Sequence, residues 1–418
     1  MSTVPFDQVI LRGCGIDVHK DVVVATISGE GLKTETRSYK TFSSSLTEWK
    51  EWLLSNGITH VAMESTGVYW KSVYKVLECP VMKVWIVNAR HIKYVPGHKT
   101  DKKDSAWICK LLLTGLLKPS YIPEREQREL RDLPRYRNKL IQHVSSEKNR
   151  IVRILEDCNI KLSSVMSHLD GVVATKLIEI LIEKGHVTKD DIACVYHKRL
   201  GASPELLYQA CEGFIEPHHT YMLQTIRKDI EQTEVIIADL TSRIKVVLSP
   251  YENVIELLQK VPGLSRKTVE DLIAEIGVDM EAFPTEKQLA SWPGICPGNN
   301  ESAGKKSGRT THGNKQLKAV ITEAAWAVTR TKNTFYSARY HRLAARRGKK
   351  RALIAVGHSI LKSVWHILKG TCEYKELGAE YLTQRMEQKR KNYLKKELEA
   401  LGYKVIISRG GGAIPDAS

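Results

Sequence analysis

The 418-residue sequence lacks the segments expected of a membrane or exported protein. No apolar stretch approaches the length of about 18 residues that a membrane-spanning helix needs. The first residues, which include Pro5 and Asp7, do not show the positive charge followed by an apolar segment that marks a signal peptide. We therefore expect a soluble, cytoplasmic protein with no membrane partner.

Paired cysteines are also missing. The sequence has eight cysteines, none of them in a Cys-x-x-Cys pair, and most lie in apolar patterns. This usage is typical of reduced thiols in protein cores and argues against disulfides or a zinc site. No internal repeat or low-complexity tract is evident, so we expect ordinary globular domains. A chain of this length has room for two or three of them.

Positive charge is what the sequence has in excess. Lysine and arginine together number 64 against 47 aspartates and glutamates, which gives a formal net charge of +17. Such an excess favours a polyanionic partner, most simply DNA or RNA. A basic composition can also serve solubility alone, so other signals of nucleic-acid binding have to decide.

Short β-rich runs alternate with helical patterns up to about residue 120. The expected strands are Val9–Cys14, Val22–Ile27, His60–Met63 and Lys83–Val87, and a helix is expected over Ser45–Leu54. This alternation predicts an α/β domain built on one sheet. Pro119 and Pro123 close the pattern, and we place the first domain at residues 1–124.

Four acidic residues of this domain stand out by their positions. Asp17 and Glu64 lie at the ends of apolar runs, while Asp101 and Asp104 are three apart at the start of a helical pattern. Carboxylates gathered at one point would repel one another unless a divalent cation held them, and Mg²⁺ prefers such oxygen ligands. The sequence therefore predicts a two-metal site for phosphoryl transfer. The alternative is that these are four unrelated acids.

The surroundings favour the site. Asp101 and Asp104 lie among cations that include Lys99, Lys102 and Lys103. Acids set in a basic surface are what a nuclease-like site gripping a phosphate backbone requires.

A second region, residues 125–250, is helical and strongly charged. Apolar residues recur in steps of three and four from Leu223 to Val247, with the polar Thr233 among them, and a weaker pattern runs from Leu140 to Cys158. This spacing predicts a coiled-coil seam. A helical hairpin within one chain would give the same pattern, so the partner helix is left open.

Residues 251–370 hold a second set of candidate residues. Val261-Pro262-Gly263-Leu264 followed by a helical pattern from Lys267 to Ile276 predicts a helix-hairpin-helix, whose turn can hold a phosphate through backbone N–H groups. Gly263 and Lys267 are the candidate nucleic-acid contacts of this motif. A polar, glycine-rich loop follows from Trp292 to Lys315. Its candidate phosphate-binding cations are Lys305, Lys306, Arg309 and Lys315, and its serines are Ser302 and Ser307. Residues 371–418 form a basic tail.

Together these motifs resemble those of the DEDD transposases of bacterial insertion sequences, the insertion-sequence family 110 with its 1111 branch, whose relatives include the DNA invertase Piv. The N-terminal motifs are Gly15-Ile16-Asp17-Val18-His19-Lys20, Met63-Glu64-Ser65-Thr66-Gly67 and Thr100-Asp101-Lys102-Lys103-Asp104. The C-terminal motifs are Val261-Pro262-Gly263-Leu264, the loop from Pro297 to Gly304, and Gly313-Asn314-Lys315. The resemblance covers nearly the whole chain.

The resemblance implies a RuvC-like domain of RNase H fold, a coiled-coil linker and a mainly α-helical transposase domain. It assigns Asp17, Glu64, Asp101 and Asp104 to Mg²⁺ and makes Ser302 the nucleophile. One departure from many relatives is that Ala303 separates Ser302 from Gly304. The resemblance also implies donor and target DNA, a structured bridge RNA that guides them, and dimers or tetramers.

The expected reaction is attack of Ser302 on DNA, assisted by Mg²⁺, to leave a 5′-phosphoserine link and a free 3′-hydroxyl. Two other readings compete with it. A metal-dependent nuclease or junction resolvase would use the same acids with water as the nucleophile. A catalytically silent DNA- or RNA-binding protein would need neither the acids nor the serine.

Overall fold

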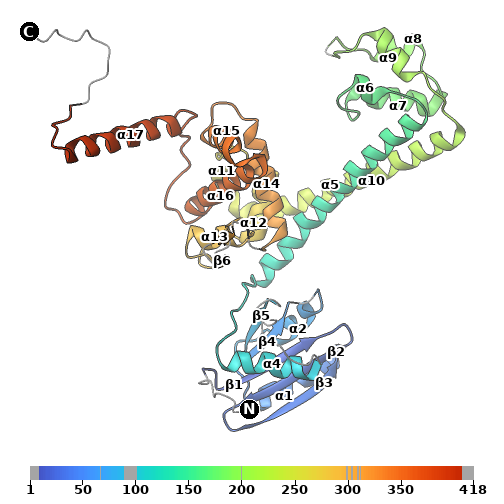
Figure 1. Ribbon diagram of the computed structural model, residues 1–418. Helices are drawn as coiled ribbons and strands as arrows, with labels where there is room; N and C mark the ends of the chain where they lie inside the picture. The colour runs from blue at the N-terminus through green and yellow to red at the C-terminus, as the bar shows by residue number, and fades with distance from the viewer. Residues whose placement is uncertain are drawn as a thin grey trace, which may run out of the picture. The chain divides into compact units, whose positions relative to one another are not determined.

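The computed structural model describes residues 9–65, 67–88, 101–198, 200–297, 300–302, 305–307, 310 and 312–406, and for 101–103, 300–302 and 305–307 it describes the backbone alone. The chain divides into two compact units, Met1–Glu124 and Arg125–Ser418. The first is an α/β unit and the second is mainly helical, as the sequence predicts (Figure 1).

One five-stranded mixed sheet forms the centre of the first unit. Its strands are β1 (Arg12–Val18), β2 (Val22–Gly29), β3 (Leu32–Lys40), β4 (His60–Glu64) and β5 (Lys83–Val87). They lie in the order β3-β2-β1-β4-β5. β1 pairs antiparallel with β2 and parallel with β4, so β1 is the strand at which the sheet changes from antiparallel to parallel pairing.

Each face of this sheet buries its own apolar cluster, because successive residues of a strand point to opposite faces. Cys14, Ile16 and Met63 pack with residues of α1 (Ser43–Ser55) and α2 (Trp70–Leu77) on one face. On the other, Ala62 and its neighbours pack with α4 (Asp101–Leu113). The helix α4 therefore covers the face opposite to α1 and α2.

The structure differs from the sequence prediction at two strands of this unit. The first strand begins at Arg12 rather than Val9 and continues to Val18. The strand β3 was not predicted, because none of its residues is buried and it lacks the apolar alternation of a half-buried strand.

Two long helices, α5 (Arg125–Asp157) and α10 (Pro217–Leu248), pack along each other in the second unit (Figure 1). His143 lies 2.7 Å from Asp229, and Asp157 lies 3.4 Å from His219. Higher numbers in α5 thus meet lower numbers in α10, so the two helices run antiparallel. The predicted seam residues of α10, including Thr233, are all buried or half-buried.

Four short helices, α6 (Leu162–Val165), α7 (Val172–Lys184), α8 (Lys189–Val195) and α9 (Pro204–Cys211), connect the long pair and share one core with it. The rest of the second unit is η1 (Ser249–Tyr251), α11 (Glu252–Gln259), α12 (Arg266–Ile276), α13 (Glu286–Ser291), the hairpin β6 (Asn300–Ser302) and β7 (Lys305–Ser307), α14 (Lys315–Thr329), α15 (Phe335–Arg347), α16 (Lys349–Leu368) and α17 (Tyr381–Ala400). Among the described residues, no helix is both long and apolar enough to span a membrane.

Candidate functional site

The register of the sheet places Asp17 beside Glu64. β1 and β4 pair in parallel from Gly13 with His60 to Ile16 with Met63. One further step along both strands brings Asp17 level with Glu64. Both residues are two positions beyond a residue that contacts α4, namely Gly15 and Ala62, so they lie on the face that α4 covers.

The packing of α4 on β1 shows where its acidic end lies. A Cβ atom added at Gly13 would meet Leu112 and Leu113, while one added at Gly15 would lie 2.2 Å from the Ser105 oxygen and the Cys109 nitrogen. Two residues of strand span about 7 Å, which equals four to five residues of helix. Asp17, two residues after Gly15, is therefore level with the first turn of α4, which holds Asp101 and Asp104.

Buried polar contacts hold that first turn against the sheet. Ser105 is fully buried, and its hydroxyl lies 2.8 Å from that of Thr26, which lies 2.8 Å from that of Thr36. Farther along α4 the Cys109 thiol donates to the Gly13 carbonyl at 3.4 Å, and burial raises the pKa of this thiol to about 11. The helix therefore packs closely on β1, and only a residue lacking a side chain fits at position 15.

The acids could hold a divalent cation through oxygen ligands alone, as Mg²⁺ prefers. Asp17 is one-fifth exposed, and His19 Nε2 lies 3.1 Å from its carboxylate. The described side chains of this site do not by themselves form a group of three metal ligands. The side chain of Asp101 lies outside the described part, as do those of Lys102 and Lys103, and Lys99 lies outside the described residues altogether.

The segment for which the sequence predicts a helix-hairpin-helix forms two helices of the second unit, α11 and α12, with Pro262 and Gly263 between them. Gly263 has φ +85°, and a Cβ atom there would lie 2.3 Å from Val328 and 2.5 Å from the Ala324 oxygen of α14. Packing against α14 accounts for the glycine. Lys267, which we expected to contact nucleic acid, forms an ion pair at 3.1 Å with Asp271 in the same helix.

Sequence reasoning missed a buried charge network between α5 and α12. Arg137 is 2 % exposed and contacts Glu270 at 2.8 Å and Asp271 at 2.9 Å. Glu275 is also buried and forms a two-pronged ion pair with Arg135 at 2.7 and 2.9 Å. Alternating Arg and acidic residues in two helices far apart in sequence could have suggested pairing, but the pattern does not say that the pairs are buried.

The serine loop begins and ends on fixed residues. Pro297 and Thr310 form an isolated antiparallel bridge. The backbone nitrogen of Asn314 donates to the Trp292 carbonyl at 2.8 Å, and a Cβ atom at Gly313 would lie 2.3 Å from the same oxygen. Asn314 also caps α14, since its side-chain oxygen accepts hydrogen bonds from two backbone nitrogens of the first turn.

Within the loop, β6 and β7 form a short hairpin. Their register pairs Asn300 with Ser307 and Ser302 with Lys305, and Ser302 is the last residue of β6. Lys306 lies in β7 opposite Glu301. Arg309 lies outside the described residues, and Lys315 is the exposed first residue of α14.

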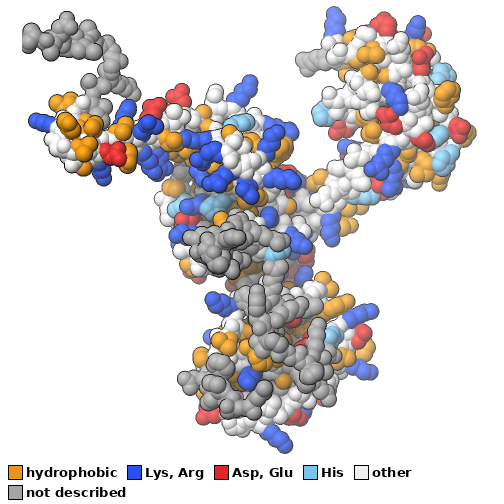
Figure 2. Space-filling model, viewed as in Figure 1, with side chains coloured by type: hydrophobic (Ala, Val, Ile, Leu, Met, Phe, Trp, Pro, Cys, Tyr) orange, Lys and Arg blue, Asp and Glu red, His pale blue; other side chains and the backbone are white. Residues whose placement is uncertain are grey.

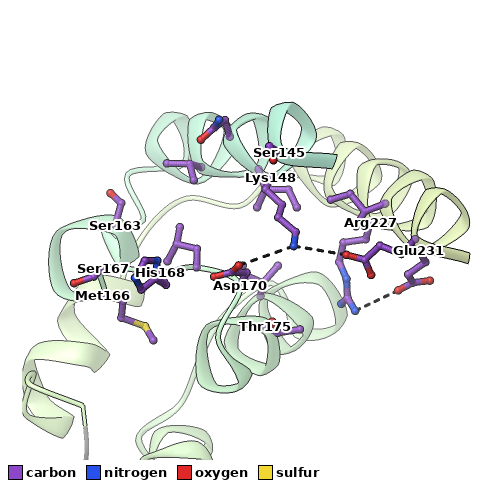
Figure 3. Close-up of a pocket in the computed structure, with 17 residues that line it drawn as sticks. Ser145, Lys148, Ser163, Met166, Ser167, His168, Asp170, Thr175, Arg227 and Glu231 are labelled. Carbon is purple, nitrogen blue, oxygen red and sulfur yellow. Dashed lines mark ion pairs between the residues drawn. The ribbon is translucent and has the colours of Figure 1, made fainter. Parts of the chain in front are cut away.

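A separate pocket of about 610 Å³ lies between the long helices and α6 and α7 (Figure 3). Its charged side chains pair with one another. Lys148 lies 3.6 Å from Glu234 and 4.0 Å from Asp170, and Arg227 lies 3.6 Å from Glu231. These cations are thus already neutralised by acids of the same pocket, which gives no reason to assign it an anionic ligand.

Comparison with known proteins gives two family matches, one in each part of the chain that carries candidate residues. Residues 14–160 match the model of the IS110-type DEDD transposases, and residues 255–341 match the model described as transposase, IS116/IS110/IS902 family. The first match includes Asp17, Glu64, Asp101 and Asp104, and the second includes Ser302.

A similar curated protein is the candidate transposase y4qE of Sinorhizobium fredii. It is 20 % identical over 258 residues, which make up 61 % of this chain and 55 % of the relative. The chain thus spans about half the length of that relative. Because two separate regions in the same chain match models of one family, the protein belongs to the IS110 family of DEDD transposases.

Proposed function

We propose that this protein is the transposase of an insertion sequence and recombines DNA by serine attack. The observation that carries the proposal is the presence, in one chain of this family, of two acids side by side on β1 and β4, two more at the start of α4, and a serine loop with a fixed base. In this proposal, Asp17, Glu64, Asp101 and Asp104 form the acidic site of a RuvC-like domain.

The four carboxylates would hold Mg²⁺, which neutralises charge on a phosphate and lowers the pKa of a nearby hydroxyl when it is bound. The residues fit the ion, since hard cations take carboxylate oxygens. The protein's own contribution is to hold the acids in place. Gly15 lets α4 approach β1, and the Ser105 and Thr26 hydroxyls hold its first turn.

Ser302 is the proposed nucleophile. Its oxygen forms a bond to the scissile phosphorus, the bond to the 3′-oxygen of the leaving strand breaks, and the serine proton passes to that 3′-oxygen through solvent or a base. The 5′-phosphoserine link conserves one phosphodiester for each one broken, so strands can be rejoined without ATP. The cations of the loop, Lys305, Lys306, Arg309 and Lys315, would bind flanking phosphates.

The finer parts of the proposal concern partners. We propose donor and target DNA as substrates, a structured bridge RNA as the guide, and a dimer or tetramer as the active form. The antiparallel packing of α5 on α10 within the chain supports the helical hairpin as the origin of the predicted seam, so a dimer or tetramer would assemble through other surfaces. Gly263 and Lys267 would contact phosphate in addition to the contacts they already make, which are the packing of Gly263 against α14 and the ion pair of Lys267 with Asp271.

The proposal that the four carboxylates hold Mg²⁺ for DNA cleavage can be tested directly. The assay contains the purified full chain, its co-purifying RNA and a plasmid that carries the chain's gene with flanking DNA. We expect strand cleavage in Mg²⁺ that EDTA abolishes, and loss of cleavage in Asp17→Asn. Asp21→Asn is the matched control, because Asp21 is exposed and lies outside the acidic site. Equal cleavage by both variants would contradict the acidic site.

A further inference from the structure

The longest acid-free stretch of the chain was not singled out from the sequence. Residues 324–372 contain eleven lysines and arginines and no aspartate or glutamate. Figure 2 shows Lys and Arg side chains gathered over the part of the second unit that contains α14, α15 and α16. Neither predicted motif set includes these residues.

The charge is densest where α15 meets α16. Gly348 ends one helix and starts the next, and the five cations around it form what we term the basic turn: Arg346, Arg347, Lys349, Lys350 and Arg351. All five are exposed. Within the described part of the chain, none of them forms an ion pair, in contrast to the paired cations of α5.

The helices supporting the basic turn are firmly packed. Tyr336 and Tyr340 of α15 are buried, and Ala352 and Val356 bury the first turns of α16. The turn itself is open, because nothing lies within 4 Å of a Cβ atom added at Gly348. The cations thus stand on a rigid corner with space in front of it.

This arrangement costs stability in the absence of an anion. Five like charges within six residues repel one another, and Lys349, Lys350 and Arg351 lie in the first turn of α16, where the helix dipole disfavours positive charge. A phosphate would relieve both effects. The charges therefore fit a polyanionic ligand better than a solvated surface.

We propose that the basic turn is a docking surface for the backbone of duplex DNA, outside the acidic site and the serine loop. The phenylalanine and the two tyrosines of α15, Phe335, Tyr336 and Tyr340, are buried or half-buried, so this helix exposes no Phe, Tyr or Trp ring beside the basic turn. Single-strand binders combine cations with exposed aromatic platforms, whereas contacts to a duplex backbone need cations alone. The inference takes DNA as partner from the proposed function, and it adds a surface that reads no sequence.

The test measures binding of the full chain to a labelled duplex DNA of unrelated sequence, in EDTA so that no cleavage occurs, at several salt concentrations. The variant carries Arg346→Gln, Arg347→Gln and Lys350→Gln. Each lost phosphate contact should make the slope of log affinity against log salt shallower by about 0.9, so a change of roughly 2 to 3 is expected, with at least about tenfold weaker binding at low salt.

The matched control carries Lys228→Gln, Arg243→Gln and Lys245→Gln, which removes three exposed cations of α10. It should keep the wild-type slope, and Arg346→Lys with Arg347→Lys should keep it as well. Equal slopes for the basic-turn variant and the wild type would overturn the proposal, as would an equal loss in the α10 control. The same variants are also measured with duplex RNA. Weaker binding of the basic-turn variant to duplex RNA alone would overturn DNA as the partner.

Failure of this inference and failure of the proposed function are distinguishable. Ser302→Ala should bind duplex DNA with the wild-type slope, because the serine is not in the basic turn. The wild-type chain could form no covalent link to DNA while the basic-turn variant still shows the shallower salt slope. That result would support the docking surface and contradict only the recombination mechanism.

Discussion

The side-chain amide of Asn314 donates to Glu275 at 2.6 Å, and this hydrogen bond joins the end of the serine loop to the buried ion pairs between α5 and α12. Asn314 caps α14 with its oxygen while its nitrogen reaches the carboxylate. One residue thus fixes the loop end, a helix start and a buried acid.

Replacing Asn314 should separate these roles. Asn314→Ala removes both the cap and the bond to Glu275, whereas Asn314→Ser keeps a capping oxygen. We expect the alanine variant to lower the free energy of unfolding by about 1 kcal/mol more than the serine variant does. Chemical denaturation of both variants measures this difference. Equal losses would show that the cap contributes nothing.

Arg137→Met should be among the most destabilising changes in the second unit. It leaves Glu270 and Asp271 buried with their charge only partly balanced by Arg266, Lys267 and Asn138, and the expected loss is about 3 kcal/mol. Lys395→Gln is the control, since it breaks a half-exposed pair with Glu399 and should cost less than about 0.5 kcal/mol. Similar losses for both would contradict a structural role of the buried network.

The sequence predicted the class of each unit because periodicity records which residues are buried. In the structure, the apolar run Val22–Ile27 forms the mostly buried strand β2, and most residues at the steps of three and four in α10 are buried. The edge strand β3 could not be predicted in this way, because it buries none of its residues. The partner of the α10 seam could not be predicted either, since a hairpin and an oligomer bury the same residues.

Gly15→Ala should disrupt the acidic site from a distance. The new methyl group would lie 2.2 Å from backbone atoms of α4, so the helix has to move away from β1 at a cost of about 1 to 3 kcal/mol. Mg²⁺-dependent cleavage should fall with it. Gly201→Ala is the control, because nothing lies within 4 Å of the added atom there. Normal cleavage by Gly15→Ala would contradict the inferred position of α4.

The stability of the first unit should depend on pH through the buried thiol of Cys109. Burial raises its pKa from 9.0 to about 11, so in this interval the unfolded chain has lost a proton that the folded chain keeps. The free energy of unfolding should therefore fall as the pH rises from about 9 to 11. Thermal unfolding of the full chain checks this, and the decline should be smaller in Cys109→Ala. An identical decline in the variant would exclude Cys109 as the cause.

The candidate site could be predicted only in part. Some of its residues are marked by the local sequence, and others depend on contacts with distant parts of the chain. Asp17 and Glu64 lie at the ends of apolar runs that form neighbouring strands, so their meeting at adjacent positions of the sheet could be expected. Gly263 and Lys267 fit a phosphate-binding turn by residue type, but their packing and pairing depend on α14 and Asp271, which the local sequence does not specify. The basic turn has no periodic or motif signature. In the sequence it is marked only by a long stretch without aspartate or glutamate.

The covalent link to DNA tests the central claim most directly. Purified chain, its co-purifying RNA and Mg²⁺ are incubated with the plasmid carrying the gene and flanking DNA, and protein bound to DNA 5′ ends is measured on a denaturing gel. Ser302→Ala is compared with Ser307→Ala, a matched serine of the same hairpin. We predict a link in wild type and Ser307→Ala that is absent in Ser302→Ala. Cleavage without any link, equal in all three proteins, would contradict serine recombination and indicate a metal-dependent nuclease.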